Sequence, residues 1–139
     1  MQTDKHIRDF IHPRDVRQLP MAAMHGVMAM RLCVICHRVG HDPAHDLLQR
    51  FGNELATNRF QVIFEVIGKT WPDPFAVSRA CCPLLTPDES MFANMMIAAC
   101  NQDRAAFDFE TSEMFGSDAR GTLFAALSAF ERARMSETH

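Results

Sequence analysis

The fold of this chain is decided by the apolar stretch MAAMHGVMAMRLCVICHR, residues 21–38. Pro20 stands directly before it and suits the first position of a helix, while Gly40 follows at a position where helices commonly end. The sequence therefore predicts one long helix that opens at Pro20 and ends at Arg38 or Val39. Its uninterrupted apolar runs are far shorter than the roughly 20 residues that a bilayer span needs, so we expect no membrane segment.

Cap and turn residues predict further helices along the rest of the chain. The clearest signal is Thr86-Pro87-Asp88-Glu89, in which Thr86 caps a helix and Glu89 stands where a capping box needs its carboxylate. No alternating strand pattern of useful length is present. We expect an all-α fold: a single helical domain over residues 1–139, a compact bundle of five or six helices, with residues 1–18 and 135–139 partly peripheral. The expected helices span about residues 20–39, 42–51, 53–69, 87–101, 103–115 and 117–134, and Ile7, Phe10 and Ile11 form the apolar side of a short turn before them.

Residues 71–87 form the least regular stretch, because their four prolines forbid a continuous helix. We expect a long folded loop, and long loops in compact domains are often functional. Trp71, Asp73 and Phe75 could form a recognition element that sets two aromatic rings beside rigid prolines. Alternatively, the loop packs both rings onto the core.

Composition and charge exclude several classes of function. The chain has 139 residues, a net charge of -3 and an isoelectric point near 6.1, so it has no global basic field and we expect no nucleic-acid partner. The first twenty residues contain no apolar region of the kind that a secretory signal needs. We therefore expect a cytoplasmic protein whose five cysteines are reduced.

The string Cys33-Val34-Ile35-Cys36-His37 carries the main chemical candidates. On a helical wheel, Arg31 and Arg38 mark the side expected to be most exposed to water, and Cys33 lies nearly opposite them. The simplest interpretation is that Cys33 and Cys36 are core residues, because free cysteine packs as a small hydrophobe. The string also has the form of a c-type haem attachment motif, but it lies deep inside a helix of a chain without an export signal, so haem is not expected.

A zinc-like metal site is the second interpretation of these residues. Cys33 and His37 are four residues apart and share a helix face, with Cys36 beside them. A structural zinc site needs four nitrogen or sulfur ligands, and the proline-rich loop offers Cys81 and Cys82. We therefore consider zinc as an alternative to a protein without a cofactor.

A thiol redox site is the third interpretation. Over these few residues the string resembles the C-x-x-C-x-x-x-H motif of the alkyl-hydroperoxide-reductase D family, which is all-helical and cytosolic. Where that family has its histidine this chain has Gly40, with His41 one position later and His37 three positions earlier. The resemblance implies redox chemistry at Cys33 and Cys36, although catalytic cysteines of this kind favour a helix N-terminus.

Met21, Met24 and Met28 lie on one side of the long helix, away from the cysteines. A helix that is apolar on both sides must bury both, and a second copy of the chain could cover the methionines. We therefore expect a homodimer that binds a further protein of unknown identity. The sequence contains no nucleophile elbow, phosphate loop or dinucleotide fingerprint, so no catalytic residue is assigned. The expected function is an interaction or regulatory module without catalysis, with the metal-binding and redox functions as alternatives.

Overall fold

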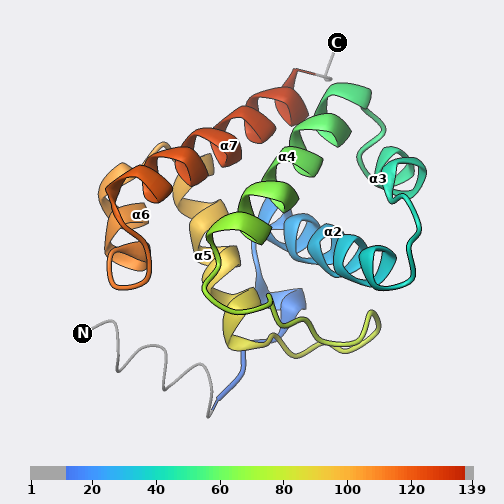
Figure 1. Ribbon diagram of the computed structural model, residues 1–139, viewed down its shortest axis with the longest axis horizontal. Coiled ribbons are helices and arrows are strands. Elements are labelled where there is room, and N and C mark those ends of the chain that lie inside the picture. The colour runs from blue at the N-terminus through green and yellow to red at the C-terminus, as the bar shows by residue number, and fades with distance from the viewer. Residues whose placement is uncertain (1–11, 137–139) are drawn as a thin grey trace.

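The computed structural model describes residues 12–136 and is all-α over that range, as predicted (Figure 1). These residues form six α-helices and one short 3₁₀ helix, and none of them belongs to a β-strand. In chain order the elements are η1 (Val16–Gln18), α2 (Met21–Arg38), α3 (Ala44–Phe51), α4 (Glu54–Thr70), α5 (Pro87–Cys100), α6 (Arg104–Thr111) and α7 (Ser117–Met135).

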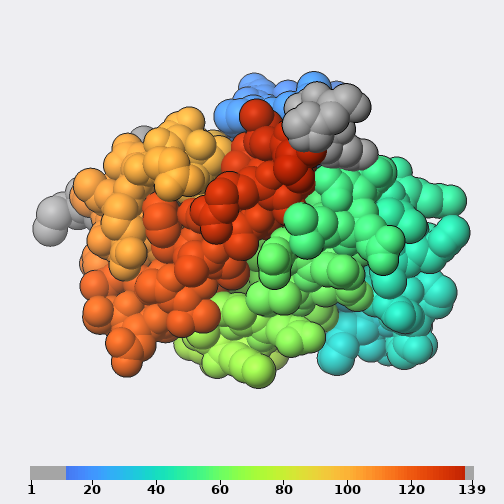
Figure 2. Space-filling model, turned by 90° about the horizontal axis from the view of Figure 1, so that it is seen from above, coloured from blue at the N-terminus to red at the C-terminus, as the bar shows by residue number. Residues whose placement is uncertain are grey.

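Helix α5 is the centre of the bundle and packs against α2, α6 and α7. Helix α4 lies along α7, and α3 packs against α4. Seen from above, α7 crosses the molecule diagonally between α6 and α4 (Figure 2). The core is rich in aromatic rings: the centroid of Phe60 lies 5.3 Å from that of Phe130 and 6.5 Å from that of Phe92. Phe60, Phe92 and Phe130 are fully buried, so they join α4, α5 and α7 into one apolar core.

Side chains of cap residues stabilise the starts of three of the six α-helices, α4, α5 and α6. The Glu89 amide donates to Thr86 Oγ1 over 3.0 Å and the Thr86 amide donates to Glu89 Oε1 over 2.9 Å, which confirms the predicted capping box. The side chains of Asn53 and Asp103 accept from the first turns of α4 and α6 in the same way. Gly52 ends α3 in the left-handed region, with φ 66°, where glycine carries no steric penalty.

Helix α6 is shorter than its sequence indicated. We expected it to continue to residue 115, but it ends at Thr111, and the amides of Met114 and Phe115 both donate to the Thr111 carbonyl in a turn. The turn sends the Phe115 ring into the core, where its centroid lies 5.3 Å from that of Trp71. Burial of this ring against Trp71 stabilises the turn.

The helical-wheel interpretation was wrong mainly in its prediction for Arg31. We expected it on the wet side of the long helix, but it is 1% exposed. Its Nε donates to Glu89 Oε2 over 2.7 Å and its Nη1 donates to the Cys82 carbonyl over 2.7 Å. Residues 71–86, which contain no helix, cover this face of α2 and α5 and exclude water from the ion pair. Arg38, in contrast, is exposed as expected.

The chain before α2 contributes to the core. Val16 and Leu19 are buried, and the Arg14 guanidinium donates to Ser90 and to Asn94 of α5. The short amphipathic turn predicted with Ile7, Phe10 and Ile11, and residues 137–139 of the expected peripheral tail, lie outside the described residues. Within the described range, no helix combines the length and apolarity needed to cross a bilayer.

Candidate metal centre

The end of α2 folds back on itself and brings His41 to Cys36. The amides of Val39 and His41 both donate to the Cys36 carbonyl, the second over 2.9 Å. Gly40 makes this reversal, because its φ of 71° lies in the left-handed region where a side chain would be strained. The chain then turns into α3, where Asp42 Oδ1 accepts from the Ala44 amide and starts the helix.

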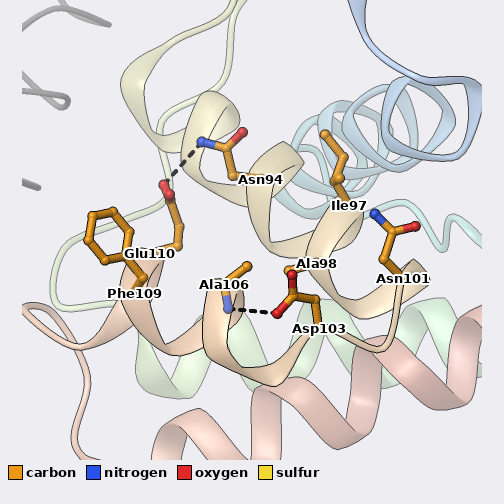
Figure 3. Close-up of a pocket in the computed structure, with 8 residues that line it drawn as sticks. All are labelled: Asn94, Ile97, Ala98, Asn101, Asp103, Ala106, Phe109 and Glu110. Atoms are coloured by element: carbon orange, nitrogen blue, oxygen red, sulfur yellow. Dashed lines mark hydrogen bonds between the residues drawn. The ribbon is translucent and has the colours of Figure 1, made fainter.

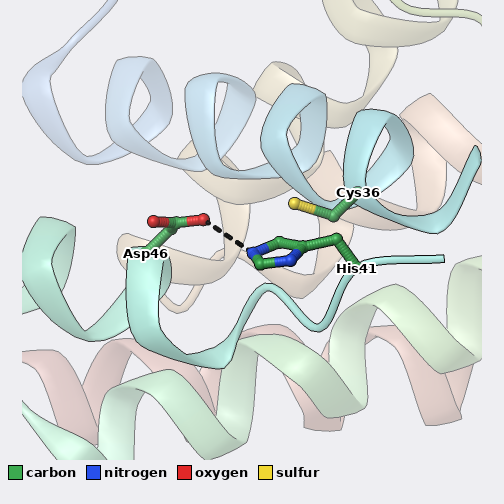
Figure 4. A group of neighbouring side chains, drawn as sticks. All are labelled: Cys36, His41 and Asp46. Atoms are coloured by element: carbon green, nitrogen blue, oxygen red, sulfur yellow. Dashed lines mark ion pairs between the residues drawn. The ribbon is translucent and has the colours of Figure 1, made fainter. Parts of the chain in front are cut away.

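Three different metal-ligating groups meet at this turn (Figure 4). The ligand atoms of Cys36, His41 and Asp46 all lie within 4.8 Å of one another. They come from the end of α2, the connecting turn and the first turns of α3. His41 Nε2 lies 3.5 Å from Asp46 Oδ2, so the carboxylate faces the imidazole. No other group of three such residues is this close in the described part of the chain.

The three side chains differ in their access to water. Cys36 is 4% exposed, Asp46 is half-buried and His41 is exposed. Burial raises the pKa of the Cys36 thiol, and the negative charges of Asp46 and Asp42 raise it further. Without a cation nearby, Cys36 is therefore a neutral thiol at neutral pH. A bound metal ion reverses this preference, because it stabilises the thiolate directly.

Of the residues predicted as metal ligands, the structure brings only Cys36 into this group. Cys33 is buried on the core side of α2, and His37 points to Phe64, with the two ring centroids 6.0 Å apart in an edge-on arrangement. Cys81 and Cys82 lie on the loop that covers Arg31, whose guanidinium donates to the Cys82 carbonyl. Residues 31 and 33 point to nearly opposite sides of a helix, so the loop cysteines lie on the far side of α2 from Cys33.

His41 and Asp46 are the candidate ligands that the sequence did not assign to a site. His41 continues the four-residue spacing from His37, but Gly40 ends the helix between them, and the spacing alone does not indicate that the chain then turns back. The usable signal is the glycine itself. A left-handed residue at the end of a helix, followed by a histidine and then by Asp42-Pro43, indicates a tight reversal between two helices.

The geometry does not favour thiolate redox chemistry at the two cysteines. Burial raises the pKa of Cys33 to about 12, with a smaller contribution from Cys36. Both residues lie in the second half of α2, whereas a reactive thiolate is stabilised at a helix N-terminus. Both thiols are therefore protonated at neutral pH.

The other predicted residues lie in separate places. Trp71 is buried and Phe75 half-buried, both packed on the core, while Asp73 is exposed on the loop between them. The side chains of Met24 and Met28 pack partly against the core, and Met21 is 68% exposed. The homodimer expected from these methionines stays a prediction.

A small cavity of about 300 Å³ lies between α5 and α6 (Figure 3). Three of its four polar side chains, Asn94, Asp103 and Glu110, already have structural partners. Asn94 accepts from Arg14 and donates to Glu110 Oε2 over 3.2 Å, and Asp103 caps α6 through the Ala106 amide. Asn94 and Glu110 therefore connect α5 to α6 and Asp103 caps α6, and we assign the cavity no ligand.

Comparison of the chain with protein-family models, with curated proteins and with solved structures finds no match. Function is therefore inferred from the geometry of the molecule itself.

Proposed function

We propose that this protein binds one divalent ion of the zinc class through Cys36, His41 and Asp46. The observation that supports the proposal is the meeting of one sulfur, one nitrogen and one oxygen ligand, from three different segments, within 4.8 Å. Zinc is bound by these ligand types, and its protein sites are usually four-coordinate. Three protein ligands leave the fourth position to water or to a small ligand.

The charges of the three groups match a divalent ion. A thiolate at Cys36 and a carboxylate at Asp46 carry two negative charges, and His41 contributes a neutral imidazole. Together they neutralise a dication at a site where one ligand is almost fully buried, so no net charge is placed in a half-buried environment. Magnesium and calcium prefer an all-oxygen shell, so the sulfur and nitrogen ligands select against them.

A bound ion would join the end of α2 to the start of α3. The three ligands span only residues 36–46, and within the described residues the His41–Asp46 pair is the one ion pair that joins this turn to α3. Metal binding would therefore tighten this corner of the bundle. An ion that binds the folded state alone raises the free energy of unfolding by about 2.7 kcal/mol at a free concentration one hundred times its Kd. The regulatory role expected from the sequence fits an ion that is gained and lost at an exposed edge.

The homodimer, the protein partner and the cytoplasmic location are kept as parts of the same proposal. The exposed side chain of Met21 supports a contact surface, although Met24 and Met28 on the same side of α2 pack partly against the core. Five cysteines without a paired partner suit a reducing compartment, where zinc-class ions are held by thiolates. Sedimentation at tens of micromolar tests the dimer, and a monomer there would remove it.

Isothermal titration calorimetry with zinc tests the metal proposal. We expect one ion per chain, and we expect His41→Gln to weaken binding by more than about tenfold, since even outer-shell ligand partners contribute that much. The matched control is His45→Gln, which removes an exposed histidine of the same α3 corner that lies outside the group. Equal weakening by both variants, or binding of magnesium as tight as that of zinc, would contradict the proposal.

A further inference from the structure

A groove of about 700 Å³ lies between the second half of α2, the last turns of α4 and the start of the proline-rich loop. This volume is typical of sites for small organic molecules, which range over about 300–1,000 Å³. We propose that this groove binds a small amphipathic anion, with an apolar body in the groove and a single acidic group at its rim. The proposal does not rest on the metal site, whose ligands do not line the groove.

The walls of the groove are apolar and held in place. Val34, Phe64, Ile67 and Phe75 line it. The Phe75 ring is fixed by two aromatic neighbours, because its centroid lies 4.9 Å from that of Trp71 and 6.1 Å from that of Phe92. A wall fixed in this way is already formed before a ligand arrives, so little ordering opposes binding.

Gly68 keeps one side of the groove open. It lies in the last turns of α4, where glycine destabilises a helix relative to alanine. Neither backbone conformation nor close packing requires it, because its φ is not in the left-handed region and an added Cβ would meet nothing within 4 Å. A larger residue would extend into the open space of the groove. The glycine therefore preserves volume that a bound molecule can use.

The charges at the rim select the head group. His37 and Arg38 line the groove, and no ion pair between the residues of the described range involves either of them. Arg38 thus offers guanidinium donors in the geometry that a carboxylate accepts. Glu65 lines the groove as well, and its negative charge opposes a second acidic group on the ligand. A single acid group on an apolar body can therefore pair with Arg38 while it keeps the repulsion from Glu65 small.

Trp71 provides a direct assay, because it is the only tryptophan and its ring contacts Phe75. Its fluorescence is measured while the protein is titrated with octanoate, octanol or octylamine. We expect a saturable change with octanoate, a weaker one with octanol and none with octylamine. Arg38→Gln should weaken octanoate about tenfold and leave octanol unchanged, since a charge-assisted hydrogen bond is lost. Arg59→Gln, an exposed arginine elsewhere on α4, is the matched control.

Blocking the groove separates this proposal from nonspecific binding. Gly68→Leu should abolish the octanoate response, and Gly68→Gln repeats the test with a polar side chain should the first variant not fold. Gly121→Leu, at another helical glycine with no neighbour within 4 Å of its Cβ, should bind as the original chain does. The proposal is overturned by an unchanged response in Gly68→Leu, by equal affinity for octanoate and octanol, or by the absence of a saturable change. It is also overturned if Trp71 emission changes with protein concentration and does not change with octanoate, since a second copy of the chain would then fill the groove.

Discussion

Replacing Arg31 by methionine should remove much of the stability of the fold. The guanidinium donates to Glu89 over 2.7 and 3.1 Å and to the carbonyls of Cys82 and Leu84 over 2.7 and 3.2 Å, with both charged side chains 1% exposed. Arg31→Met has a similar apolar stem but leaves the Glu89 carboxylate buried without its cation. Breaking one partner of such a pair costs about 3–5 kcal/mol. For a domain with a total of about 5–15 kcal/mol, this is a large fraction.

Urea unfolding followed by circular dichroism and by Trp71 fluorescence measures the loss. With a slope of about 2 kcal/mol per M, a loss of 4 kcal/mol moves the midpoint down by about 2 M. The double variant Arg31→Met with Glu89→Gln should recover part of the loss, because the amide keeps an acceptor for the Thr86 cap and carries no charge. Arg104→Ala breaks the exposed pair with Asp108 and should cost at most about 1 kcal/mol. An Arg31→Met midpoint no lower than that of Arg104→Ala would refute this reasoning.

Three further measurements test other contacts. Thr86→Ala should lower the free energy of unfolding by about 1–2 kcal/mol, while Thr86→Ser retains the cap, and urea midpoints of the two variants check this. Burial, with Arg50 and Arg134 in smaller part, lowers the pKa of His25 in the folded state, so the unfolded state binds more protons and stability falls as pH drops below about 6.5. His25→Gln should flatten that slope between pH 7.5 and 5.5, and an unchanged slope would remove His25 as its source. In native-state thiol labelling the exposed Cys81 should react fast and Cys33, whose pKa is about 12, only on unfolding; loss of the fast phase in Cys81→Ser confirms the assignment.

Local signals in the sequence predicted the helices well, because caps act over a few residues. The capping box at Thr86, the cap at Asp103 and the glycine at residue 52 place their helix ends within a residue or two. The predicted end of α6 was wrong, because the true end depends on the burial of Phe115 against Trp71, which lies 44 residues earlier in the chain.

The candidate site was predictable only in part, since it depends on how segments meet. The motif made Cys36 a candidate ligand, but the two side chains grouped with it follow from the reversal at Gly40 and from the docking of α3, which no local pattern measures. Arg31 shows the same limit. A charged residue on a helix predicts a solvent-exposed face. The loop that carries Cys82 nevertheless covers Arg31, and Glu89 neutralises its charge.

Cobalt binding tests the central claim most directly. Cobalt(II) takes zinc sites, and a cysteine thiolate bound to it gives a charge-transfer band in the near ultraviolet. We expect this band to rise to one equivalent in the original chain, to be lost in Cys36→Ser and to be retained in Cys82→Ser, the matched loop cysteine. A band that survives in Cys36→Ser, or that is lost in Cys82→Ser, would contradict a metal centre at the junction of α2 and α3.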